Sequence, residues 1–242
     1  MNPWQLYDHL LASISGDIKV EKVLQGSEWT FARLENGFCG LNATQPEPTD
    51  INPGKYEGMA VSEAAGLIRS WNWREAAVGG AIINAVLNRV EHFGAQDNPD
   101  AFLRYRDRCQ GKKVAVIGHF AYLEKRLKGL CDLYILERSV QPGDYHDSAC
   151  EYLLPGMDVV FITGSALANK TLPRLLELSK NAFTVISGPS TPVSPALFDF
   201  GVDALCGFCV TREDLARQAT ETHAPIFSCG EMICLEKGAP VL

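Results

Sequence analysis

The first third of the chain alternates apolar and polar residues in short stretches. Between residues 18 and 43 the alternation is interrupted twice by turn signals, a Gln-Gly pair and then an Asn-Gly pair. Because a period of two places successive side chains on opposite faces of a strand, this stretch predicts three short antiparallel strands. A loop rich in Pro, Gly and Asp follows, and the apolar spacing then predicts helices over residues 62–71 and 73–91. Strands followed by helices indicate an α+β module.

Beyond residue 111 the pattern changes to continuous apolar runs that alternate with helical spacing. These runs are rich in Val and Ile: KVAVIG, DLYILE, DVVFIT, FTVIS and ALCGFCV. Such runs are typical of parallel strands covered on both faces, and right-handed crossovers between them give a doubly wound sheet. We therefore predict an α/β protein with two domains, a small α+β domain over residues 1–98 and a Rossmann-like domain over residues 99–242.

The composition narrows the class of partner. Hydrophobic residues make up 46% of the chain, and the formal net charge is −7. An acidic chain lacks the basic face that a nucleic acid or an anionic membrane requires, so we expect neither as a partner. No stretch reaches the roughly 20 apolar residues of a membrane span, and the first residues lack the pattern of a signal peptide. We expect a cytoplasmic protein that binds a small molecule; whether it forms a homo-oligomer stays open.

The eight cysteines do not form the pattern of a secreted disulfide framework. Cys206, Cys209, Cys229 and Cys234 have spacings that could suit a four-thiolate zinc site. However, the first two lie in ALCGFCV, which has the pattern of a buried strand, and a redox Cys-x-x-Cys normally opens a helix. Buried thiols with a packing role are therefore the favoured interpretation, and a metal or redox role is the alternative.

The turn after the run KVAVIG departs from the dinucleotide-binding pattern. Gly-x-Gly-x-x-Gly would place two more glycines after Gly118, but His119 and Phe120 follow instead. Ligands of open α/β sheets bind beyond the carboxyl ends of the strands, so this turn still faces a ligand site. An imidazole titrates near neutral pH, which makes His119 a candidate proton donor or acceptor, or a metal ligand. A structural role beside the next helix is the alternative.

Glu137 ends the second run, 19 residues after Gly118. An acidic residue at this position accepts hydrogen bonds from ribose hydroxyls in nucleotide-binding sheets. Arg138 follows it directly and could balance an anionic group on a ligand or simply pair with Glu137. The sequence therefore predicts a functional carboxylate at Glu137, against the alternative of a solvated strand end.

Two further strand ends carry turns that combine glycine with hydroxyl groups. Glycine permits close backbone approach, and hydroxyls with free N–H groups suit an anion or a polar ring. Either turn could instead serve only to cap the next helix. Since both lie at one edge of the sheet, they predict a polar-ligand pocket formed by Thr163, Gly164, Ser165, Asn169, Gly188, Pro189, Ser190 and Thr191.

Two other polar residues, Asp144 and Asn84, are further candidates for a site. Asp144 begins an Asp-Tyr-His-Asp cluster that resembles a metal site, although a capping box directly follows it. Asn84 interrupts the apolar stripe of a predicted helix. A buried amide is costly unless it is hydrogen-bonded, so Asn84 either satisfies a neighbouring loop or faces a ligand between the two halves.

Four ordered motifs resemble those of a known family: KVAVIGHF, ILERSVQPGD, TGSALANKTL and ISGPSTPVSPALFDFGVD. They are similar to the putative heavy-metal chelation domain family, and EWTFARLENGFCGL and AAVGGAIINAVLN look like its accompanying N-terminal domain. The resemblance implies an N-terminal domain similar to the capping domain of enolases, a Rossmann-like C-terminal domain and a site at their junction. The family-motif positions are Asn84, His119, Glu137, Arg138, Gly143, Asp144, Thr163, Asn169, Gly188, Pro189, Ser190 and Thr191.

The favoured hypothesis is a protein that binds, and processes, a polar or anionic small molecule at the domain junction, linked to heavy-metal chelation or chelator metabolism. His119, Glu137 and Asp144 are its candidate catalytic residues. The candidate ligand-binding residues are Asn84, Gly118, Arg138, Gly143, Thr163, Gly164, Ser165, Asn169, Gly188, Pro189, Ser190 and Thr191. One alternative is a non-catalytic metal carrier or sensor, and another is a nucleotide- or S-adenosylmethionine-dependent enzyme. Cofactors stay open, a metal ion included.

Overall fold

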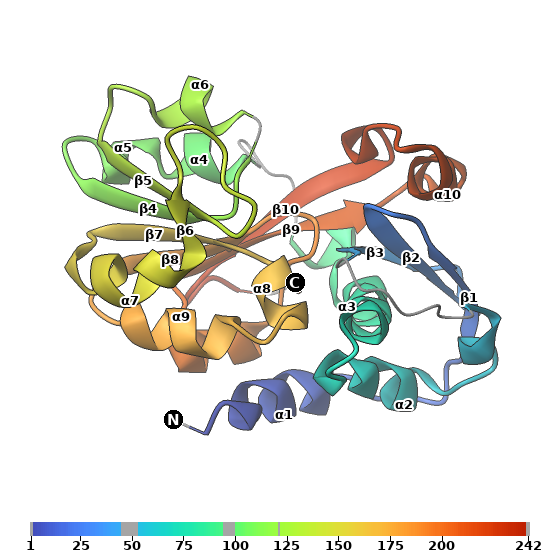
Figure 1. Ribbon diagram of the computed structural model, residues 1–242. Helices are drawn as coiled ribbons and strands as arrows, with labels where there is room; N and C mark the ends of the chain where they lie inside the picture. The colour runs from blue at the N-terminus through green and yellow to red at the C-terminus, as the bar shows by residue number, and fades with distance from the viewer. Residues whose placement is uncertain (1, 45–52, 94–99, 121, 241–242) are drawn as a thin grey trace.

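The structure is a computed structural model that describes residues 2–44, 53–93, 100–120 and 122–240. Its N-terminal half contains an antiparallel sheet in the order β1-β2-β3, on which one long helix packs (Figure 1). The elements are α1 (Trp4–Ala12), β1 (Val20–Gln25), β2 (Trp29–Leu34), β3 (Cys39–Ala43), α2 (Val61–Ala65) and α3 (Trp73–Leu87). The three predicted strands are thus present.

The helix predicted over residues 62–71 is shorter than expected, because α2 ends at Ala65 and a 3₁₀ turn covers Gly66–Arg69. The next helix, α3, begins after Asn72, whose side-chain oxygen accepts hydrogen bonds from the backbone N–H groups of Arg74 and Glu75. Gly40 lets β3 approach α3 closely, since a Cβ at Gly40 would lie 2.9 Å from the Asn84 carbonyl carbon. This close packing makes the middle of α3 buried all round.

The C-terminal half contains a seven-stranded sheet in the order β10-β9-β8-β7-β4-β5-β6. All pairs are parallel except the antiparallel pair of β9 and β10. The strands are β4 (Lys113–Ile117), β5 (Asp132–Glu137), β6 (Tyr145–His146), β7 (Val159–Thr163), β8 (Phe183–Ser187), β9 (Ala204–Val210) and β10 (Gly230–Glu236). The predicted fold class is confirmed: a doubly wound, mostly parallel sheet follows a small α+β part.

Helices cover both faces of this sheet, as the continuous apolar runs predict. One face packs against α4 (Ala101–Arg104), α5 (Arg106–Cys109) and α6 (Leu123–Leu127), and the other against α7 (Cys150–Leu153), α8 (Ser165–Ala168) and α9 (Leu172–Leu178) (Figure 1). One expected helix is absent. The chain after β5 passes through a loop and the two-residue β6 before it reaches α7, whereas only a 3₁₀ turn, Pro195–Phe200, follows β8, because prolines there lack the N–H groups of a helix.

The two halves share buried apolar contacts. The largest cluster of buried side chains includes Leu6 of α1 and Val78 of α3 together with Ile162 of β7 and Leu167 of α8. A second contact involves β9, whose Phe208 packs beside β2, β3 and α10 (Glu213–Thr222). The predicted division at residues 98 and 99 lies outside the described residues, so the domain boundary stays a prediction. Within the described residues, no helix is long and apolar enough to cross a membrane.

The cysteines differ in one respect from the favoured interpretation. Cys206 and Cys234 face each other across β9 and β10 and form a disulfide. Cys209 and Cys229 are buried free thiols, as expected for a packing role. Because successive residues of a strand point to opposite faces, Cys206 and Cys209 lie on different sides of β9, and the four cysteines do not converge as a zinc site would require.

Candidate functional site

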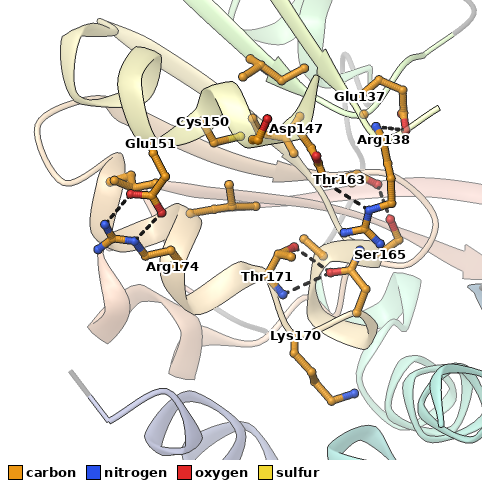
Figure 2. Close-up of a pocket in the computed structure, with 18 of the residues that line it drawn as sticks. Glu137, Arg138, Asp147, Cys150, Glu151, Thr163, Ser165, Lys170, Thr171 and Arg174 are labelled. Carbon is orange, nitrogen blue, oxygen red and sulfur yellow. Dashed lines mark hydrogen bonds and ion pairs between the residues drawn. The ribbon is translucent and has the colours of Figure 1, made fainter. Parts of the chain in front are cut away.

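A cavity of about 550 Å³ lies at the carboxyl edge of the seven-stranded sheet. It opens beside β4, where the strand order reverses, with β7 on one side and β5 on the other. Open α/β sheets bind their ligands at this switch point. Its walls come from the ends of these three strands and from α7, α8 and α9 (Figure 2). Trp73 of the N-terminal half also lines it. Six predicted site residues line it: Gly118, Glu137, Arg138, Thr163, Ser165 and Asn169.

Glu137 ends β5 and holds the two neighbouring turns. Its Oε2 accepts the backbone N–H of His119 at 2.9 Å, while Oε1 accepts those of Arg138 at 2.6 Å and Ser139 at 3.1 Å. Three N–H donors stabilise an ionised carboxylate. The observed contacts of Glu137 therefore position the turns around the pocket, and they occupy lone pairs that a ribose hydroxyl would otherwise use.

The guanidinium of Arg138 has two contacts, one through its Nε atom and one through its flat face. Its Nε lies 3.1 Å from Asp147 Oδ2, and its guanidinium carbon lies 5.2 Å from the centre of the Trp73 ring. The two terminal nitrogens have no hydrogen-bond partner among the described residues. In Figure 2 the side chain extends from β5 toward the loop that carries Thr163 and Ser165. A guanidinium oriented in this way offers two parallel donors, the geometry that suits a carboxylate or phosphate.

The facing wall supplies further donors. The hydroxyls of Thr163 and Ser165 lie 3.0 Å apart, so one of the two protons is used between them and the other is free for a ligand. Asn169 Oδ1 accepts from the backbone N–H and the hydroxyl of Thr171, at 3.1 and 2.6 Å. Its Nδ2 is thus left as a donor with no partner among the described residues.

The remaining charged groups of the pocket neutralise one another. Arg174 of α9 donates to both carboxylate oxygens of Glu151 in α7, at 2.9 and 2.6 Å, and to Glu177 at 2.6 Å. These hydrogen bonds lower the pKa of Glu151. Asp147 pairs with Arg138. The carboxylates of the pocket are therefore occupied, and its unused polar groups are donors.

Lys170 also lines the cavity, but its amine points away from the other charged groups of the pocket. In Figure 2 its side chain points away from Arg138 and the other labelled charged groups. Its Nζ donates to the Ala168 carbonyl at 2.6 Å, burial lowers the pKa of the amine to about 8, and the backbone has a positive φ of 69°. Sequence reasoning missed Lys170, Arg174 and Trp73. The motif TGSALANKTL contains Lys170, but the other two lie far from the strand ends where a site was sought.

His119 and Asp144 are joined directly, and each is close in sequence to residues that line the pocket. His119 Nδ1 lies 3.0 and 3.2 Å from the two carboxylate oxygens of Asp144, whose side chain is only 1% exposed. Neither residue lines the cavity, although both neighbours of His119 in this network, Gly118 and Glu137, do. All three candidate catalytic residues are therefore connected by hydrogen bonds.

Phe120 occupies the place next to the two strand-end glycines. Gly118 and Gly188 both have positive φ, 102° and 109°, and Cβ atoms there would lie 3.7 and 3.5 Å from the Phe120 ring. In a dinucleotide-binding turn, this space beside the glycines admits the pyrophosphate. The aromatic ring that fills it weighs against a dinucleotide. Gly143, with φ 98°, forms the exposed turn before Asp144.

The turn after β8 contacts the N-terminal half instead of the pocket. Ser190 Oγ accepts the Ala43 N–H at 2.8 Å, and Asn84 Nδ2 donates to the carbonyls of Leu41 and Pro189, at 2.8 and 3.3 Å. Thr191 is buried against Gly164. The structure thus separates these predicted ligand-binding residues, namely Asn84, Gly164, Gly188, Pro189, Ser190 and Thr191, from those that line the cavity.

Asn88 connects the same turn to α3 and was not expected from the sequence. Its Nδ2 donates to the carbonyls of Thr191 and Phe208, at 2.9 and 3.1 Å, and its Oδ1 accepts the Val193 N–H at 2.9 Å. The side chain is 2% exposed. Asn88 follows the last residue of α3, where a polar residue is common in any protein, so no sequence signal distinguishes it.

Two family models match the chain, over residues 7–87 and 100–222, and both are described as "Putative heavy-metal chelation". The second covers more than half of the chain. The chain belongs to the family that carries this description. This confirms the resemblance that the four sequence motifs indicated.

Solved structures of the family share the fold along nearly the whole chain. A protein of unknown function from Desulfitobacterium hafniense is 37% identical, with a TM-score of 0.91 over 97% of this chain and 98% of that one. Another, from Pyrococcus horikoshii, is 22% identical, with a TM-score of 0.80 over 98% and 100%. An uncharacterized protein of Methanocaldococcus jannaschii is 34% identical over 160 residues, which are 63% of this chain and 60% of that protein.

The family description implies a metal, but the side chains do not converge on one. Heavy-metal sites use thiolate, imidazole and carboxylate ligands. Among the described residues, no three His, Cys, Asp or Glu side chains are grouped as metal ligands. Cys150 is the cysteine that lines the pocket, and burial raises the pKa of its thiol to about 11. The described residues therefore do not fit a preformed metal centre.

Proposed function

We propose that the protein binds a small anionic molecule in this pocket and that Arg138 holds its acid group. The observation that carries the proposal is the position of the Arg138 guanidinium. It is fixed by Asp147 and Trp73, and its two outer nitrogens are unused among the described residues. Charge-assisted hydrogen bonds from a fixed guanidinium are the strongest that a protein offers to a carboxylate or phosphate.

The rest of the pocket suits an apolar body attached to that acid group. The volume of about 550 Å³ lies within the range for small-molecule sites. Its apolar wall comes from strands, helices and the Trp73 ring: Ile117, Leu136, Ala166, Leu175 and Leu178. Beside the acid group, Asn169 Nδ2 and a hydroxyl of Thr163 or Ser165 would donate hydrogen bonds. The ligand class that fits is an anion with an apolar portion of moderate size.

The connection to heavy metals is then made through the ligand. An organic chelator, or its precursor, carries acid groups of the kind that Arg138 would bind. This agrees with the family description without requiring a metal centre built from protein side chains, which the described residues do not supply. A carrier that binds the metal directly is the weaker alternative for the same reason.

A thermal-shift screen tests the proposal. The protein is screened against small carboxylates and phosphates, each paired with its neutral amide or ester. Anions are expected to raise the melting temperature, while their neutral counterparts do not. Arg138→Met should weaken binding of the anions by about 10- to 100-fold, the worth of about 1.5–3 kcal/mol for hydrogen bonds to a charged group.

Arg108→Met is the matched control. The Arg108 guanidinium also lies over an aromatic ring, 4.2 Å from the centre of Phe183, but it does not line the pocket. This variant should bind anions like the wild type. Equal stabilisation by neutral and anionic compounds, or unchanged binding in Arg138→Met, would contradict the proposal.

A further inference from the structure

The His119–Asp144 pair has the geometry of an acid–base device. The Asp144 carboxylate also accepts the Gln141 N–H at 3.0 Å, and its side chain is almost fully buried. An ionised carboxylate only accepts hydrogen bonds, so a neutral imidazole paired with one carries its proton on the nitrogen of the contact, here His119 Nδ1. The lone pair of the ring is then on Nε2, which has no hydrogen-bond partner among the described residues.

The ring is also fixed in position relative to the pocket. The backbone N–H of His119 donates to Glu137 Oε2, and Gly118 turns the chain off β4 with a positive φ. Both Glu137 and Gly118 line the cavity, as does Arg138 on the loop that leads to Asp144. His119 is therefore held by its backbone, next to two residues that line the proposed anion site, and by its ring, with 20% of its side chain exposed.

We propose that His119 transfers a proton to and from the molecule bound in the pocket and that Asp144 is the residue that positions it. This inference rests on the proposed function, because the anion held by Arg138 is the reactant. A C–H or O–H bond next to the acid group breaks, its electron pair stays on the ligand, and the proton moves to His119 Nε2. The imidazolium that forms is balanced by the Asp144 carboxylate, and Arg138 faces the added negative charge.

The step needs no oxidant or reductant, since the proton returns from Nε2 to another atom of the same molecule. The nearby hydroxyls are not organised as nucleophiles for His119. Thr163 and Ser165 are hydrogen-bonded to each other, and neither hydroxyl forms a hydrogen bond with the His119 ring. The reaction class that fits is therefore an isomerisation, or an exchange of a proton on the ligand itself, in which the ligand stays unattached to the protein.

Ethoxycarbonylation of histidine tests whether His119 Nε2 faces the ligand site. The wild type, Arg138→Met and Arg108→Met are treated with diethyl pyrocarbonate, with and without 4-bromobenzoate, and each site is quantified by mass spectrometry. The probe is expected to slow modification of His119 at least fivefold in the wild type and in Arg108→Met, but not in Arg138→Met. His146, which is exposed in β6, is the internal control and should react equally throughout.

The position of the ring proton is measured separately by ¹⁵N NMR of histidine-labelled protein. At pH 8 the wild type should show His119 protonated on Nδ1 and unprotonated on Nε2, a preference that Asp144→Asn reduces. The wild-type spectrum alone decides this point if the variant does not fold. A ring protonated on Nε2, or probe binding that leaves His119 modification unchanged, would overturn this inference alone. Absence of any Arg138-dependent probe binding would remove the proposed function and this inference with it.

Discussion

The guanidinium carbon of Arg138 lies 5.2 Å from the centre of the Trp73 ring. Arg138 follows β5 in the Rossmann-like part, whereas Trp73 begins α3 in the N-terminal part. The two parts of the chain therefore meet at the residue that we propose to bind the ligand. A contact of this kind holds a charged side chain in place without consuming its hydrogen-bond donors.

Trp73→Leu is expected to weaken binding of anions about two- to fivefold. The reason is the loss of a cation–π contact worth about 0.5–1 kcal/mol at an exposed site, which leaves the Arg138 side chain less fixed. Isothermal titration with the anions found by the screen measures the effect. Trp71→Leu is the control, because Trp71 is 70% exposed and does not line the pocket. Equal affinities of both variants and the wild type would remove Trp73 from the site.

Asn88→Ala should lower the free energy of unfolding by about 2–4 kcal/mol. The change leaves the Val193 N–H and two buried carbonyls without their partner, and each unsatisfied group costs about 1–3 kcal/mol. Urea denaturation followed by circular dichroism measures the loss. Asn36→Ala serves as the comparison, since Asn36 lies in an exposed turn with one long hydrogen bond of 3.3 Å. A loss no larger than that of Asn36→Ala would contradict the structural role of Asn88.

Gly164→Ala should destabilise the protein by about 1–3 kcal/mol through overpacking. Its Cβ would lie 2.6 Å from the Ser190 carbonyl carbon and closer still to the Thr191 amide nitrogen. The turns after β7 and β8 would therefore have to separate. Gly66→Ala, at a helical position with open space around it, should be neutral or stabilising by up to about 1 kcal/mol. Melting temperatures that rank the two variants the other way would refute this packing.

Lys170 predicts a distinct dependence of stability on pH. Burial lowers the pKa of its amine from 10.5 to about 8 in the folded protein. Between these values the unfolded chain binds the proton and the folded protein does not, so this residue's contribution to stability rises with pH across that window. Lys170→Met lacks the contribution. From pH 8 to pH 10 the melting temperature of the wild type should therefore rise relative to that of Lys170→Met. A difference between the two melting temperatures that stays constant over this range would show that the amine is not buried.

The fold was predictable because its signals are repeated and local. Continuous Val and Ile runs identified the five central strands, β4, β5, β7, β8 and β9, and alternation with turn signals identified β1 to β3. The edge strand β6 has only two residues and carries no periodic pattern, whereas β10 contains a short apolar run at residues 232–235 that was not predicted to be a strand. The prolines after β8 already disfavour a helix there, but an analysis of apolar periodicity alone does not take them into account.

The site was only partly predictable. Glu137, Arg138, Thr163 and Ser165 were identified by their position at strand ends. The carboxyl edge of a parallel sheet brings these ends together whatever conformation the connecting loops adopt. Sequence could not separate pocket residues from packing residues. Ser190 has the chemistry of a ligand-binding hydroxyl, yet its Oγ accepts the N–H of Ala43, and this contact depends on how the two halves dock. Trp73 enters the pocket through the same docking.

The most direct test of the central claim is a crystal structure after soaking with 4-bromobenzoate. The bromine gives an anomalous signal that marks the position of the ring, and the carboxylate marks the position of the acid group. We predict bromine in the cavity beside β4, with the carboxylate within hydrogen-bonding distance of the outer nitrogens of Arg138, and no signal there in Arg138→Met. Bromine bound at another site while this cavity holds none, or a carboxylate directed away from Arg138, would contradict the account.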